Sequence, residues 1–163
     1  MNDAKVDPAD KLAQIYIDIL QNELGLVAHA DDDKDVLFKL VDFGTFMISL
    51  DAARDPEYFM LVFPNFASSK STGMKVEDLY RIANDINLLK KAVKISVRKS
   101  DDGDFSMVAT AESFLASADQ APSSEIIKAT LGRYISAIRS GVRATVDAIE
   151  KQKSGGTQTN QTM

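Results

Sequence analysis

The stretch from Val36 to Phe66 constrains the fold of this chain more than any other part of the sequence. It holds three apolar, partly alternating runs, separated by short breaks that contain Gly44 and Pro56. Such runs predict three consecutive antiparallel strands joined by turns, because glycine adopts the backbone angles of a tight turn and proline suits a looser one. The third run, at 58–63, is apolar on both faces, which is typical of a central or fully covered strand. We therefore expect helices on one face of the sheet and a further layer, such as a second subunit, on the other.

The segments around this stretch predict three amphipathic helices and two more strands. Apolar residues recur at helical spacing over about 8–24, 75–89 and 123–151. Alternation at 92–99 and a run at 105–112, joined by an Asp-Gly turn, predict a second hairpin. The expected fold is a single α+β domain with the order α-β-β-β-α-β-β-α and a five-stranded antiparallel sheet with packed helices.

The two ends of the chain contribute nothing to this expected core. Residues 1–7 and the polar tail at 152–163 lack a periodic apolar pattern. We expect both segments to be disordered, so that the folded domain spans 8–151.

The last helix has the most regular pattern in the chain. Its apolar arc covers about half of the circumference, which is wider than one packing surface needs. A stripe of small residues lies beside that arc, formed by Ala137, Gly141, Ala144 and Ala148. One interpretation is the close approach of another backbone, such as a second subunit or a partner; the other is a sequence that has drifted without such a constraint.

Composition limits where the protein can act. The chain has 163 residues, a formal net charge of −5 and no cysteine, which excludes disulfides and thiolate metal sites and fits a reducing cytoplasm. No apolar run approaches the roughly 18 residues that a membrane-spanning helix needs, and the first residues lack the apolar region of a signal peptide. We expect a cytoplasmic protein with no membrane partner.

Residues that could support catalysis or bind a cofactor are few. The single histidine, His29, lies in a predicted linker, so no nucleophilic triad can be assembled. The acidic run at 31–35 lacks the spaced ligands and the glycine of a calcium loop. The sequence predicts no enzyme, no cofactor and no metal site, although paired carboxylates that meet only in the folded chain stay open as an alternative.

Basic residues gather around the fourth predicted strand, at Lys90, Lys91, Lys94, Arg98 and Lys99. No aromatic residues interleave with them as stacking platforms for nucleic acid would. We expect these side chains to pair with acids elsewhere in the fold, and we expect no nucleic-acid partner.

The helix at 75–89 and the hairpin after it carry a resemblance to a known family. The segment Tyr80-Arg-Ile-Ala-Asn84-Asp-Ile-Asn87 is similar to a family helix with an Asn-x-x-Asn pattern, and a basic strand and an Asp-Gly hairpin follow it. Over roughly 8–151 the chain resembles the YbjN family of proposed bacterial sensory-transduction regulators, which has the type III secretion chaperone-like fold. Asn84 and Asn87 share one face of their helix. They either hydrogen-bond a nearby strand end or loop, or contact a ligand or partner.

The resemblance implies a non-enzymatic protein-binding module, chaperone-like or regulatory. By analogy with secretion chaperones, we expect a homodimer that docks an extended segment of a partner protein, at a sheet edge or an apolar patch. The alternative is a small-molecule-binding sensory regulator.

Overall fold

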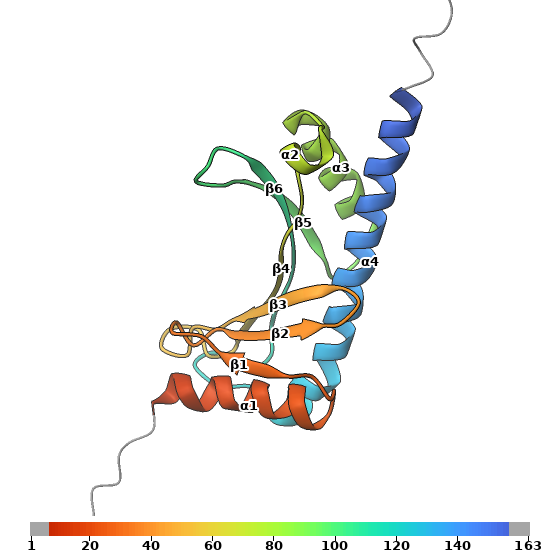
Figure 1. Cartoon of the computed structure of the whole chain (residues 1–163). Coiled ribbons are helices and arrows are strands. Elements are labelled where there is room, and N and C mark those ends of the chain that lie inside the picture. The colour runs from red at the N-terminus through yellow and green to blue at the C-terminus, as the bar shows by residue number, and fades with distance from the viewer. Residues whose placement is uncertain (1–6, 157–163) are drawn as a thin grey trace, which may run out of the picture.

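The computed structural model describes residues 7–156, which form six strands and four helices (Figure 1). In chain order these are α1 (Pro8–Asn22), β1 (Ala28–Ala30), β2 (Val36–Leu40), β3 (Gly44–Ser49), β4 (Tyr58–Ser68), α2 (Ser69–Thr72), α3 (Val76–Leu89), β5 (Lys94–Lys99), β6 (Phe105–Phe114) and α4 (Ser124–Gly156). All strands join one antiparallel sheet in the order β1-β2-β3-β4-β6-β5.

Local sequence signals set several of these boundaries. The Asp7 carboxylate accepts a hydrogen bond from the backbone N–H of Ala9 at 3.0 Å, and Pro8 occupies the first turn of α1. Gly44 opens β3 with φ 140°, and a Cβ there would come within 2.9 Å of the Phe63 ring. Only glycine therefore fits both the backbone angle and the space at this turn.

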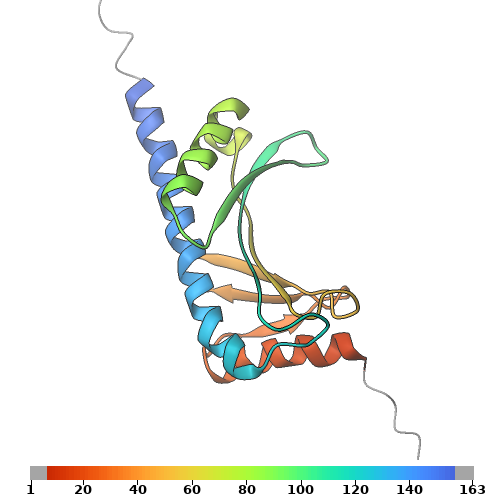
Figure 2. The same cartoon turned by 180° about the vertical axis from the view of Figure 1, so that it is seen from behind.

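The helices α1, α3 and α4 pack on a single face of the strongly curved sheet (Figures 1 and 2). The ring of Phe59 in β4 lies 5.9 Å from that of Tyr16 in α1 and 5.3 Å from that of Tyr134 in α4. Contacts from both helices to one strand residue place them on the same side. The apolar core lies in this layer, and its largest fully buried side chains include Phe38, Phe46, Phe59, Leu61 and Met107.

The α+β class and the antiparallel sheet with packed helices are confirmed, but the strand count of five and the element order are wrong. The extra strand, β1, lies in what the sequence analysis treats as a linker, and it pairs with β2 through Ala28 and Phe38. Three residues, two of them alanines, are too few to show a period-two pattern.

A second difference lies in the polar segment after the third predicted strand. β4 continues to Ser68 past Pro64, because the ladder with β6 shifts register between Phe63 and Ala67 and the N–H that proline lacks falls in that bulge. Asn65 adopts a left-handed φ of 48° there. A single turn of helix, α2, then follows, with Ser68 as its N-cap.

The expectations for the ends of the chain fall mostly on residues beyond the described range. Residues 1–6 and 157–163 lie outside it, whereas 152–156 continue α4 beyond the predicted helix end at Lys151. No helix in residues 7–156 is long and apolar enough to cross a membrane.

Candidate functional site

One face of the sheet carries no helix anywhere in the described chain (Figures 1 and 2). Its side chains alternate along each strand with those of the core. Met60 and Val62, for example, lie between the core residues Phe59, Leu61 and Phe63. We call this surface the helix-free face.

A cluster of four polar side chains lies on the helix-free face, contributed by β4, β5 and β6. Glu112 is its centre: its carboxylate accepts hydrogen bonds from the Tyr58 hydroxyl at 2.7 Å and the Thr110 hydroxyl at 2.9 Å. The ammonium group of Lys94 lies 2.7 Å from the same carboxylate. The expectation that the basic strand pairs with acids elsewhere is confirmed at Lys94, whereas Lys90, Lys91, Arg98 and Lys99 form no ion pair within residues 7–156.

These contacts shift the pKa values of Glu112 and Tyr58. The Lys94 ammonium, and then the Tyr58 hydroxyl, lower the pKa of the Glu112 carboxyl. Partial burial, and then the hydrogen bond to Glu112, raise the pKa of Tyr58 to about 12. Glu112 therefore stays ionised and Tyr58 protonated at neutral pH. With three donors already on its carboxylate, Glu112 orients its neighbours and is poorly suited to act as a general base.

An exposed aromatic ring borders the polar cluster. Phe114 is 70% exposed, and its ring centroid lies 5.5 Å from that of Tyr58. Water does not stabilise an exposed phenylalanine ring. The ring of Phe114, beside the hydrogen-bonded Tyr58, is therefore an apolar contact point on the surface.

β5 is one of the two edge strands of the sheet, the other being β1, and Asn87 of α3 occupies part of its outer edge. The Asn87 amide donates to the carbonyl of Ile95 at 2.9 Å and accepts from the N–H of Ile95 at 2.7 Å. The backbone of Ile95 therefore points away from β6, and the side chain of Asn87 pairs with it as a neighbouring strand would.

The remaining outward positions of β5 follow from the alternation of an antiparallel ladder. The N–H of Ser100 bonds the carbonyl of Asp104 across the hairpin at 2.8 Å, so the even-numbered residues face β6. The backbone groups of Val97 and Lys99 then point outward, as those of Ile95 do. In residues 7–156 no hydrogen bond reaches them from outside the sheet.

The structure separates the two predicted asparagines. Asn87 locks α3 to β5, as described above. Asn84 is exposed on the outer side of α3, between Tyr80 and Leu88 at helical spacing. Tyr80 is 50% exposed and Leu88 is 78% exposed, so this side of α3 is unusually apolar for a solvated helix.

The predicted stripe of small residues on α4 packs within the chain. A Cβ added to Gly141 would lie 2.9 Å from Val93 Cγ1 and 3.0 Å from Val93 Cγ2, so the close approach is to the segment that enters β5. Ala137, Ala144 and Ala148 are half-buried against the core. The close approach at Gly141 is therefore made within one chain, whereas the three alanines stay partly exposed.

A polar hollow of about 470 Å³ lies where the β5–β6 hairpin meets α2. Its carboxylates are already engaged: Ser69 donates to Asp104, and Lys70 bonds Asp102 at 2.7 Å. These bonds lower the pKa of both carboxyls. Asn65 accepts from Ser106 at 2.8 Å. Because these groups are paired with one another, the hollow fixes the hairpin onto α2 and is a weak candidate for a ligand site.

Sequence reasoning missed the polar cluster, although part of it was within reach. The Asp-Gly turn sets the hairpin register, which places Lys94 opposite Thr110. Glu112 lies two residues further along β6 on the same face, diagonally across from Lys94. The contribution of Tyr58 depends on the pairing of β4 with β6 across a long stretch of sequence, which no local pattern records.

The α+β fold of this chain is similar to that of solved structures. No family model and no curated protein sequence matches it. Solved structures match it in their fold. YbjN from E. coli, a candidate transcription regulator, superposes with a TM-score of 0.58 at 16% sequence identity, over 88% of this chain and 92% of that one.

A chain of the HopA1–SchA chaperone–effector complex superposes similarly. Its TM-score is 0.53 at 17% identity, over 85% of this chain and 95% of that one. The resemblance to the YbjN-like, chaperone-like fold is thus confirmed at the level of the fold.

Proposed function

We propose that this protein is a non-enzymatic protein-binding module, chaperone-like or regulatory, that docks an extended segment of a partner protein on the outer edge of β5. The observation that carries the proposal is the outward-facing backbone of Val97 and Lys99, which has no partner in the described chain. Such an edge can accept one more strand by main-chain hydrogen bonds. Support by analogy comes from the neighbours, one of which was solved as a chaperone–effector complex.

Asn87 limits how far an added strand can extend. Because its amide already bonds Ile95, a docking segment pairs from Val97 toward the hairpin tip at Ser100. The exposed side chains of Arg98 and Lys99 lie along this length. Like charges repel and opposite charges attract across an interface, so a partner segment with acidic residues is favoured.

Proline substitutions distinguish this edge from the rest of the strand. Lys99→Pro removes an N–H that points outward, so the fold should be retained while partner binding is lost. Arg98→Pro removes an N–H that bonds β6, so it should lower the melting temperature markedly. Circular dichroism and a binding assay on both variants make the comparison, and a Lys99→Pro protein that binds its partner as well as the wild type would contradict the proposal.

The partner can be identified and the contact mapped in one series of experiments. A photo-crosslinking residue at position 99 should capture the partner in the native cell, and one at position 133, on the exposed side of α4, serves as the control. Hydrogen exchange of the purified complex should then show new protection at the amides of Val97 and Lys99. Protection of amides only on other surfaces would contradict docking at the edge of β5.

We further propose that the protein forms a homodimer through the outer side of α3. Tyr80 and Leu88 are 50% and 78% exposed and lie on the same side of this helix, two turns apart. Light scattering should report a dimer at micromolar concentration, and Leu88→Glu should shift it to a monomer. Val41→Glu is the matched control, because Val41 is 91% exposed but lies in the turn between β2 and β3. A monomeric wild-type protein would contradict this assignment.

A second candidate function is a small-molecule-binding sensory regulator. One observation favours it: a groove of about 360 Å³ on α4 is lined by Lys90, Arg139 and Arg143. A thermal-shift screen of metabolites tests this function. A rise of several degrees in the melting temperature with one compound class would favour small-molecule binding over protein binding.

A further inference from the structure

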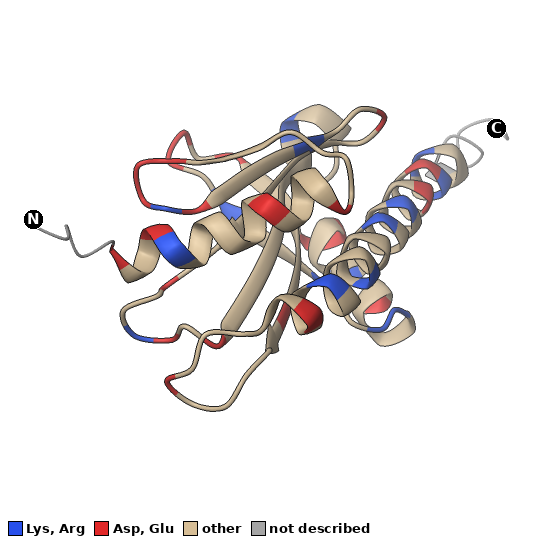
Figure 3. Ribbon diagram, turned by 90° about the horizontal axis from the view of Figure 1, so that it is seen from below, with Lys and Arg blue, Asp and Glu red and all other residues tan. Residues whose placement is uncertain are grey.

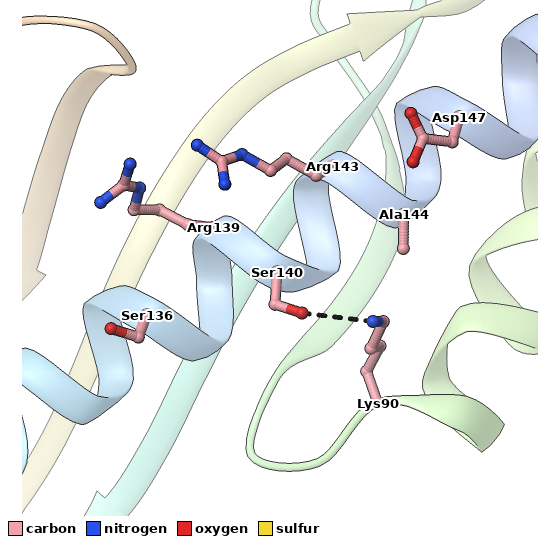
Figure 4. A pocket seen from close by; sticks show the side chains of 7 residues that line it. All are labelled: Lys90, Ser136, Arg139, Ser140, Arg143, Ala144 and Asp147. Atoms are coloured by element: carbon pink, nitrogen blue, oxygen red, sulfur yellow. Dashed lines mark hydrogen bonds between the residues drawn. The ribbon is translucent and has the colours of Figure 1, made fainter.

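The groove on α4 has a floor of small residues and walls of basic ones. Ser136, Ser140 and Ala144 recur at helical spacing along the floor (Figure 4). Arg139 and Arg143 project together to one side of the helix, and Lys90 reaches in from the end of α3 on the other. The helix surface is therefore open between two positively charged flanks.

Within residues 7–156, the basic side chains of this groove outnumber the acidic ones. Lys and Arg recur along α4 (Figure 3), and the sequence from Ile126 to Val146 contains no acidic residue. In the part of the chain that the structure describes, none of Lys90, Arg139 and Arg143 forms an ion pair. Asp147, at one end of the groove, is the single carboxylate in its lining.

Two of the three cations are held in place by uncharged groups. The Lys90 ammonium donates to the Ser140 hydroxyl at 3.2 Å, which turns it toward the groove. The Arg139 guanidinium lies 5.6 Å from the centroid of the Phe43 ring, and its Nε is buried without an acceptor.

We propose that this groove binds the phosphate group of a small anionic ligand. Two guanidinium groups one helical turn apart and an ammonium group opposite match an anion with several oxygens and more than one negative charge. A phosphate monoester carries three acceptor oxygens and a charge between about −1.5 and −2 at neutral pH, whereas a carboxylate carries a single charge. The volume is within the range of small-molecule sites, which is about 300–1,000 Å³.

The phosphate groove would be the ligand site of the second candidate function, a small-molecule-binding regulator, and it is separate from the docking edge. The groove lies on α4, and the docking positions Val97 and Lys99 lie on the outer edge of β5. A protein that fails to bind phosphate but captures a partner at position 99 would refute the groove alone. A protein that binds phosphate but captures no partner would refute the docking edge alone.

The test uses inorganic phosphate, pyrophosphate and a nucleoside triphosphate as probes, with the full chain at low ionic strength. Calorimetric titration should show binding that strengthens with the charge of the probe. In the double variant Lys90→Gln, Arg143→Gln the affinity should fall by about tenfold or more, because charged hydrogen bonds are lost. Arg133→Gln, an exposed arginine of the same helix outside the groove, should bind as the wild type does.

Ionic strength separates a built site from general attraction. Sodium chloride at matched ionic strength should not reproduce the heat of phosphate binding. Equal weakening by Arg133→Gln and by the groove variant, or chloride that competes as well as phosphate, would overturn the proposal. Circular dichroism of each variant confirms that the comparison is made between folded proteins.

Discussion

Replacing Gly141 with alanine should destabilise the protein by about 1–3 kcal/mol, although alanine is the better helix former. A Cβ at this position would meet both methyl groups of Val93, at 2.9 Å and 3.0 Å, and Val93 is itself buried. A valine side chain cannot rotate out of contact, because both of its branches face the new atom. Chemical denaturation monitored by circular dichroism measures the loss in free energy of unfolding.

The same substitution in the same helix supplies the control. Gly132→Ala meets nothing within 4 Å, so it should stabilise the protein by about 1 kcal/mol through helix propensity alone. Removing the obstacle should rescue the first variant: Val93→Ala should cost less in the Gly141→Ala background than in the wild type. Additive effects of the two substitutions would show that Val93 is not what excludes a side chain at Gly141.

Phe46→Ala should cost about 3–5 kcal/mol, enough to unfold a large share of the molecules of a marginally stable domain. Phe46 is fully buried, and its ring centroid lies 5.3 Å from that of Phe38, 5.8 Å from that of Phe43 and 4.8 Å from that of Phe63. The cavity would therefore be lined by three rings, which cannot all shift to fill it.

Phe114→Ala is the matched comparison, because Phe114 is 70% exposed on the helix-free face. Its removal should change the free energy of unfolding by no more than about 0.5 kcal/mol. Thermal and denaturant unfolding of both variants gives the comparison. Similar losses for the two would mean that the aromatic cluster around Phe46 is not the centre of the core.

The sequence pattern was reliable wherever periodicity was long. The three long helices α1, α3 and α4, the hairpin of β5 and β6 and the apolar centre of β4 all followed from it. The wide apolar arc of α4 was identified correctly, and contacts within the chain use much of it. The helix packs against the sheet and against both α1 and α3, so three surfaces of the same molecule contact it. A contact with a second chain stays a prediction.

What the sequence could not supply depends on pairing between distant residues. The choice between the two roles of Asn87 rests on where β5 passes α3, and Asn84, three residues earlier, is left exposed. The outward direction of Val97 and Lys99 follows only once the hydrogen bonds of Ile95 and Ser100 are known. The groove on α4 joins Lys90 to residues some fifty positions later, a separation that no motif spans.

The insertion of β6 between β4 and β5 has a consequence for how the polypeptide is made. While the ribosome is still translating β5, that strand has no neighbour to join, since the vacant side of β4 belongs to a segment not yet synthesised. The part of the apolar face that α4 covers also stays exposed until α4 emerges. Slow translation after residue 100 should therefore prolong an aggregation-prone intermediate. The need for cellular chaperones should rise as translation of the last part of the chain becomes slower.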